Sequence, residues 1–175
     1  MFVAIASLIV AVCDIRILAG KSDHIPDAVL MTKFMGVAGT TMTMCATFLF
    51  LLPHYGVFVI SGSLFIVHAV TPLIVLLSFV LLETTCHITV PKSLIGVIPM
   101  MVYGLVYMVE VGFIGEQNGG WADFYAYNRG GHWLASGILM TAGCFAAAFL
   151  TAVLHNLGVK HSSKNIQEKM EREHE

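Results

Sequence analysis

The sequence carries little charge. Only 11% of its 175 residues are charged, whereas an ordinary soluble domain has about 25% charged residues. Its nine Lys and Arg nearly balance its eleven Asp and Glu, and the formal net charge is -2. A water-soluble globular domain is therefore close to excluded, and we expect no nucleic acid as a partner.

Recognisable catalytic and metal-binding motifs are also missing. The eight histidines form no H-x-x-x-H or H-E-x-x-H pair, and no G-x-S-x-G, Walker A or dinucleotide-binding motif is present. The four cysteines are far apart in the sequence and form no C-x-x-C pair. We therefore expect no disulfide framework, no metal site and no bound cofactor.

Long apolar runs are present instead. Hydrophobic residues make up 57% of the chain, and about 20 consecutive apolar residues cross a bilayer as a helix. The alternating pattern of β-barrel strands is absent. We predict an all-α, polytopic transmembrane helical bundle over residues 1–159, followed by a charged tail that forms a frayed surface helix over residues 160–175. The predicted spans cover residues 2–18, 29–52, 57–82, 94–115 and 133–157.

The basic residues indicate an orientation in the membrane. Eight of the nine lie beside the first and third connections or in the tail, and such residues favour the cytoplasmic side. We therefore expect a multi-pass protein of the cell membrane with a cytoplasmic C-terminal tail. Five spans would then place the N-terminus outside. Because an apolar run begins directly at Met1, we expect one upstream span, six in the complete protein; the alternative is an N-terminus that is genuinely outside. The eight basic residues are Arg16, Lys21, Lys33, Lys92, Lys160, Lys164, Lys169 and Arg172.

Two ionisable side chains fall inside predicted spans. Such residues cost about 2.5–3.5 kcal/mol on insertion scales, so each requires a structural or functional reason. His68 lies near the middle of the third predicted span, on a face that it shares with Thr71. Glu110 lies in the fourth, on one helical face with Tyr103 and Tyr107. A meeting of His68 with Glu110 would indicate a functional site, whereas separate hydrogen-bonded packing roles are the alternative.

A further polar contact is expected where the first span ends. Asp14 and Arg16 are too close in sequence to pair on one helix face. We expect Asp14 to bond to Lys33 on the next helix, as a structural contact.

Small residues follow helical spacing on two predicted spans. They allow close helix approach, and they are candidate faces for a homo-oligomer. A threonine among them, such as Thr40, could act as a nucleophile only if a base reaches its hydroxyl. The second predicted span carries the pairs Gly36/Thr40 and Gly39/Thr43, and the fifth carries the stripe Gly137, Thr141, Cys144, Ala148 and Ala152.

The longest connection, within residues 115–133, is rich in aromatic side chains. Such residues anchor helices at the membrane interface, and a loop of this length can also cover the mouth of a bundle as a lid. Both interpretations remain open. The aromatic residues are Trp121, Phe124, Tyr125, Tyr127 and Trp133.

Three strings in a fixed order carry a resemblance to a known family. They are LFIVHAVTPLIVLLSFVLLE, VPKSLIGVIPMMVYGLVYMVEVGFIG and WADFYAYN. In this order the chain resembles the androgen-induced family of integral membrane threonine hydrolases, and it is most similar to that family's bacterial six-span relatives. A weaker match of MFVAIASLIVAVCDIRIL extends the resemblance to about Val159.

The resemblance implies a hydrolase that cleaves fatty-acid esters within the bilayer, with a threonine nucleophile and a histidine base. The family histidine falls on His68, whereas the family threonine would precede Met1, and Thr40 or Thr43 could replace it only under a different alignment. The alternative is a non-catalytic ligand-binding or permease-type subunit, with His68 and Glu110 as contacts in a cavity. Membrane lipids and a lipophilic small molecule are the partners expected in either case.

Overall fold

The computed structural model describes residues 2–84 and 86–173, and all regular structure in these residues is helical. The α-helices are α1 (Phe2–Leu18), α2 (Asp27–Ala46), α3 (Leu52–Tyr55), α4 (Ser63–Phe65), α5 (Thr71–Leu81), α6 (Val90–Ile95), α7 (Ile98–Met108) and α8 (Trp133–Glu173). Between them lie the π-helical segments η1 (Thr47–Leu51), η3 (Ile66–Val70) and η4 (Val109–Ile114), and the 3-10 segments η2 (Gly56–Ile60), η5 (Glu116–Asn118) and η6 (Arg129–Gly131).

Helices of membrane-spanning length dominate the described chain. The prediction of an all-α bundle of transmembrane type is confirmed. Four helical segments are long and apolar enough to cross a bilayer, namely Asp27–Ile60, Ser63–Leu81, Val90–Ile114 and Trp133–Arg172. The fifth predicted span is α1, which has 17 residues and is shorter than these four.

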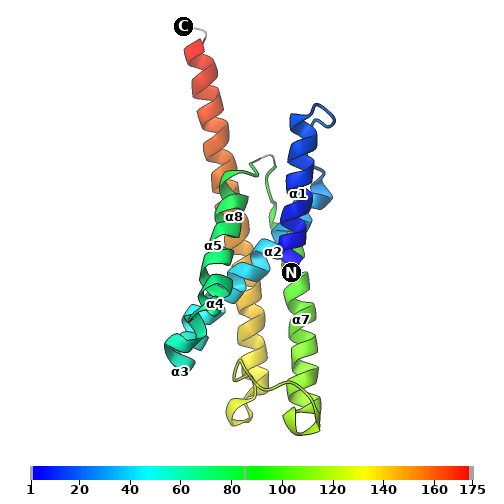
Figure 1. Ribbon diagram of the computed structural model, residues 1–175, viewed down its shortest axis with the longest axis vertical. Helices are drawn as coiled ribbons and strands as arrows, with labels where there is room; N and C mark the ends of the chain where they lie inside the picture. The colour runs from blue at the N-terminus through cyan, green and yellow to red at the C-terminus, as the bar shows by residue number, and fades with distance from the viewer. Residues whose placement is uncertain (1, 85, 174–175) are drawn as a thin grey trace.

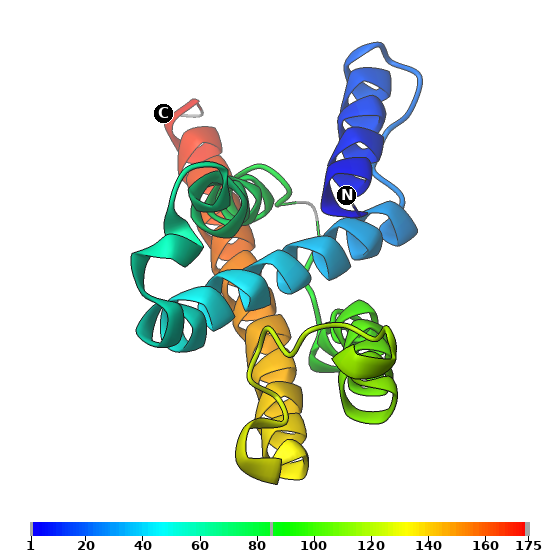
Figure 2. The same ribbon diagram turned by 60° about the horizontal axis from the view of Figure 1, so that its bottom comes forward.

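Helix α2 runs obliquely through the centre of the bundle (Figures 1 and 2) and contacts α1, α5, α7 and α8. Three of the six buried residues of one core cluster, Leu30, Phe34 and Val37, come from α2. The ring of Phe34 stacks on that of Phe79 from α5, with ring centroids 6.0 Å apart, and both side chains are fully buried. A second cluster joins Ala38 of α2 to Cys144 and Ala148 of α8.

Small residues allow these helices to approach closely. A Cβ on Gly36 would lie 3.0 Å from Val3 of α1, and a Cβ on Gly158 would lie 2.0 Å from the Val80 carbonyl oxygen of α5. Part of the predicted stripe on α8, including Ala148 and Ala152, is likewise buried within this chain. These residues therefore serve packing inside the bundle, and the homo-oligomer stays a prediction.

Two prolines follow π-helical segments at the same spacing. Pro53 comes two residues after η1, and Pro72 two residues after η3. In both places the residue before the proline donates its N–H to the carbonyl five residues earlier. This wider turn suits a residue that lacks an N–H and whose ring clashes with the carbonyl four residues back. The helix therefore continues past Pro53, where we predicted its end, as far as Tyr55, and the 3-10 segment η2 follows after the break at Gly56.

Glycines set the beginning of the third spanning helix. Gly56 has φ +68° and Gly62 has φ +54°, a conformation that other residues adopt only with strain. The helix therefore begins at Ser63 and not at residue 57 as predicted. This places His68 in the second turn of the span instead of near its middle.

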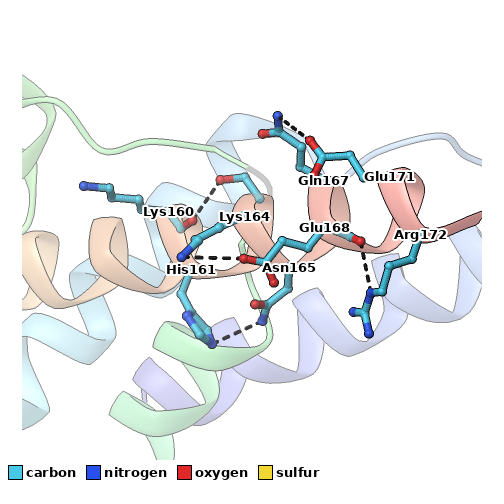
Figure 3. A network of polar contacts seen from close by, with 9 residues as sticks. Lys160, His161, Lys164, Asn165, Gln167, Glu168, Glu171 and Arg172 are labelled. Carbon is cyan, nitrogen blue, oxygen red and sulfur yellow. Dashed lines mark hydrogen bonds and ion pairs between the residues drawn. The ribbon is translucent and has the colours of Figure 1, made fainter. Parts of the chain in front are cut away.

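The C-terminal tail is part of α8 and not a separate surface helix. Helix α8 has 41 residues and a length of about 60 Å at 1.5 Å per residue, about twice the thickness of the hydrocarbon core. Its end projects beyond the other helices (Figure 1). Contacts at i, i+4 spacing support it, including Lys164 with Glu168 and Gln167 with Glu171 (Figure 3). Residues 174–175 of the predicted tail lie outside the described residues.

The connections between the helices lie at two opposite ends of the molecule. The α1–α2 connection, the α5–α6 connection and the end of α8 lie at one end (Figure 1). The end of α8 carries four of the nine basic residues, and Lys21 lies in the α1–α2 connection. The aromatic connection between η4 and α8 lies at the other end, together with α3.

Candidate ligand-binding cavity

A cavity of about 950 Å³ lies between α2, α7 and α8. The beginning of α1 borders it at one end, and the aromatic connection borders it at the other. Ligand sites are typically apolar hollows of about 300–1,000 Å³, so its size is suitable for a small molecule. Its lining from α2 includes Gly36, Gly39, Thr40, Met42 and Thr43; α7 contributes Met100, Met101, Tyr103, Gly104, Tyr107 and Met108; α8 contributes Leu134, Gly137, Met140, Thr141 and Cys144.

The lining is apolar and adaptable. Methionine has three rotatable bonds and a polarisable sulfur, and it is common in sites that accept varied apolar ligands. Among the described residues that line the cavity there is no Asp, Glu, Lys, Arg or His. The polar side-chain groups there are hydroxyls of threonine and tyrosine, the Cys144 thiol and the indole N–H of Trp133. Six of the chain's ten methionines line it, namely Met35, Met42, Met100, Met101, Met108 and Met140.

One carboxylate holds the aromatic connection against α7. The Tyr107 hydroxyl donates to Asp123 Oδ1 at 3.0 Å and accepts the Tyr125 N–H at 3.0 Å. The Asp123 carboxylate also accepts the N–H groups of Tyr127 at 2.7 Å and Asn128 at 2.8 Å. Because Tyr125 and Tyr127 line the cavity, the connection borders this end of it, and we call residues 115–132 the lid. The two predictions for this loop, an aromatic belt and a lid, are compatible in this geometry.

Tyrosine rings cluster at this end of the cavity. The Tyr107 ring lies in edge contact with Tyr125 and Tyr127, with centroids 5.1 and 6.0 Å away. Tyr103 and Tyr125 both line the cavity at this end. Gly137 makes room for the cluster, since a Cβ at that position would lie 2.8 Å from the Tyr127 hydroxyl.

We predict that Tyr107→Phe loosens the lid without unfolding the bundle. The change removes the donor to Asp123 and the acceptor for the Tyr125 N–H, and a buried polar group left without its partner costs about 1–3 kcal/mol. Hydrogen exchange at the amides of Tyr125 and Tyr127 should accelerate about tenfold or more. Tyr55→Phe is the control, because Tyr55 contacts the same lid through its ring, stacked on Phe124 at 5.6 Å. Equal exchange in the two variants would contradict this role of Tyr107.

Three of the residues predicted to line a site lie at this cavity. They are Thr40, Tyr103 and Tyr107. The Thr40 hydroxyl lies 3.0 Å from the Val37 carbonyl and 3.2 Å from the Gly36 carbonyl of its own helix. It is therefore occupied as a donor within α2.

The other three predicted residues lie elsewhere. His68 Nδ1 donates to the Val59 carbonyl at 2.9 Å. Glu110 is half-buried in η4, and no ion pair joins it to His68 in the described chain. Neither residue lines the cavity, nor does Thr71. The structure thus places Thr40, the nucleophile considered under a different alignment, at the cavity and His68 outside its lining.

Comparison with known protein families, with curated proteins and with solved structures adds no relative. None of the three gives a match. The candidate site therefore depends on its own geometry.

Sequence reasoning missed a polar cluster at the opposite end of the bundle. Lys33 forms an ion pair with Glu83, and both side chains are 4% exposed. The ammonium group also donates to Ser78 Oγ at 3.1 Å. We predicted Asp14 as the partner of Lys33, but its direct ion-pair partner is Glu83. The sequence did contain a sign of this ion pair, since Glu83 is a charged residue at the end of a long apolar run.

His155, also missed, connects α8 to the α5–α6 connection. It is fully buried, and its ring stacks on Phe79 with centroids 4.4 Å apart. Nδ1 lies 3.2 Å from the Phe79 carbonyl and Nε2 lies 2.9 Å from the Cys86 carbonyl. The Asn156 amide adds a pair of bonds to the backbone of Ile88, at 2.9 and 2.8 Å.

We predict that His155→Phe exposes Cys86 to alkylation. Burial, and after it the Asp27 carboxylate, raise the pKa of the Cys86 thiol, so little reactive thiolate forms at neutral pH. Maleimide labelling should be slow in a variant whose other cysteines, Cys13, Cys45 and Cys144, are replaced. Labelling should become about tenfold faster when His155→Phe releases the connection.

His161→Phe, on the exposed part of the same helix, is the matched control for the Cys86 measurement. It should leave the labelling rate unchanged. Asn156→Leu should accelerate labelling as well, because it removes the bonds to Ile88. Unchanged labelling in both His155→Phe and Asn156→Leu would show that these contacts do not hold the connection.

Proposed function

We propose that this chain is a multi-pass membrane protein that binds a lipophilic small molecule in the cavity between α2, α7 and α8. The observation that carries the proposal is the chemistry of the lining: an apolar, methionine-rich hollow of about 950 Å³ with hydroxyl groups at one end. A water-soluble metabolite would meet too few polar groups there, whereas a molecule dissolved in the bilayer fits the lining and reaches it laterally.

Hydrolysis of a fatty-acid ester, which the family resemblance implies, is the second candidate. The presence of Thr40 and Thr43 at the cavity favours it. Both hydroxyls, however, donate to carbonyls of α2, with Thr43 at 3.0 Å from Gly39. A threonine nucleophile needs a base within hydrogen-bond distance, and His68 lies outside the lining. Binding is therefore the better-supported function.

We also propose that the end bearing the basic connections and the projecting part of α8 is cytoplasmic, in the cell membrane. The gathering of these basic segments at one end (Figure 1) supports this orientation. The aromatic lid would then face outward, at the depth where tyrosine and tryptophan rings favour the interface.

Photolabelling tests the binding proposal. The probe is 3-(trifluoromethyl)-3-phenyldiazirine, a small apolar molecule without a polar head, applied to the full chain in lipid nanodiscs. We expect saturable labelling of peptides from residues 98–108 and 134–145, which border the cavity. The peptide of residues 71–81, from α5 outside the cavity, should show only labelling that rises linearly with probe concentration. Linear labelling in all three peptides would overturn the proposal.

A further inference from the structure

The cavity offers no partner for a charged ligand. Its described lining has no basic residue to pair with a carboxylate or phosphate and no acidic residue to pair with an amine. The Asp123 carboxylate, which is bonded to Tyr107 of the lining, already accepts hydrogen bonds from Tyr107, Tyr127 and Asn128. An ion placed in an apolar hollow without a partner loses several kcal/mol of solvation. The lining therefore discriminates against fatty-acid anions, phospholipids and cationic amphiphiles.

The tyrosine end does offer hydrogen bonds to a neutral head group. Tyr103 and Tyr125 both line the cavity, and each hydroxyl has one donor and two acceptor sites. The two side chains therefore place O–H donors and acceptor sites at this end of the cavity. Burial raises the pKa of the Tyr125 hydroxyl, so this group remains protonated and neutral at physiological pH. Tyr107 is not available in the same way, since Asp123 and the Tyr125 N–H occupy its hydroxyl.

We infer that the ligand of this cavity is an uncharged, long-chain lipid with a hydroxyl or carbonyl head, and that the head bonds to the Tyr103–Tyr125 pair while the chain lies among the methionines of α2 and α7. This inference depends on the proposed binding function and adds the chemical class of the ligand.

The order of residues along the helices supports this orientation of the ligand. Helix α7 runs from Ile98 toward the lid, so Tyr103 and Tyr107 lie nearer the lid than Met100. Helix α8 begins at Trp133 just after the lid, and Cys144 lies about three turns deeper. The tyrosine hydroxyls are thus at the lid end, and the deep end is bordered by apolar groups such as Phe2 and Val3.

Competition against the diazirine label tests the ligand class. The competitors share a 16-carbon chain and differ in the head: hexadecanol and methyl palmitate are neutral, hexadecyl sulfate is an anion, and hexadecyltrimethylammonium is a cation. Each is added at equal low mole fraction to the same nanodiscs. We expect both neutral lipids to reduce cavity labelling at concentrations at least tenfold lower than either charged lipid. Tyr103→Phe should weaken hexadecanol competition about fivefold, the effect of losing one hydrogen bond.

The outcomes separate the two proposals. If a charged lipid competes as well as hexadecanol, or if Tyr103→Phe leaves hexadecanol competition unchanged, the assignment of the ligand class is wrong while the binding site stands. If the diazirine shows no saturable labelling of the cavity peptides even without competitor, the binding function itself is wrong. Tyr55→Phe, which alters a tyrosine outside the cavity lining, should leave every competition curve unchanged.

Discussion

Gly104→Phe is expected to abolish ligand binding while the protein stays folded. Gly104 lies in the interior of α7 and lines the cavity, and no heavy atom lies within 4 Å of a Cβ built at this position. A phenyl ring can therefore enter the hollow without clashing with the backbone. It would occupy the volume that a ligand chain needs. We expect saturable photolabelling to fall at least tenfold, equivalent to about 1.4 kcal/mol of binding free energy.

The stability of the Gly104→Phe variant separates a filled cavity from a damaged fold. Glycine in a helix interior is destabilising by about 0.5–1 kcal/mol relative to alanine, and the new ring gains apolar contacts. The thermal midpoint should therefore stay the same or rise. Gly112→Phe is the matched control, because Gly112 has no heavy atom within 4 Å of its Cβ position and lies outside the cavity lining. If Gly104→Phe binds as tightly as the unchanged chain, the cavity is not the ligand site.

Much of the fold was predictable because membrane-spanning helices can be recognised in a sequence from the length and apolarity of their runs. The boundaries were less predictable. The predicted end at Pro53 was wrong because a π turn before the proline shifts the hydrogen bonds by one residue. The predicted start of the third span was wrong because the conformation of Gly62 depends on how the chain turns between two helices. Neither feature leaves a periodic signal in the apolar pattern.

The candidate site was predictable only in part. Helical spacing correctly grouped Tyr103 with Tyr107, because residues four apart share a helix face. It could not determine which face meets which neighbour, since that depends on the tilt of α2 across the bundle. Thr40 therefore lines the cavity whereas His68 does not. Lys33 likewise pairs with a residue 50 positions away in the sequence. The fold of the lid depends on local contacts, because Asp123 accepts the backbone N–H groups of residues four and five positions later in the sequence.

Breaking the Lys33–Glu83 pair is expected to cost more stability than any other single change proposed here. Both side chains are 4% exposed, and one oxygen of the carboxylate, Oε2, has no hydrogen-bond partner among the described residues. Lys33→Met would leave a buried carboxylate without its counter-charge, at a cost of about 3–5 kcal/mol. Glu83→Gln would leave a buried ammonium group and should destabilise to a similar degree. Unfolding in mixed detergent micelles, followed by tryptophan fluorescence, measures both effects.

The double variant decides between loss of a charge pair and loss of packing. Lys33→Met with Glu83→Gln removes both charges, and a neutral pair of similar volume avoids the cost of an unpaired ion. It should therefore be more stable than either single variant, with a positive coupling between the two sites. Lys92→Met is the control, because Lys92 pairs with Asp27 at 3.0 Å where the side chains are 39% and 71% exposed, and it should change stability little. If the two single losses simply add in the double variant, the side chains contribute through packing and not through their charges.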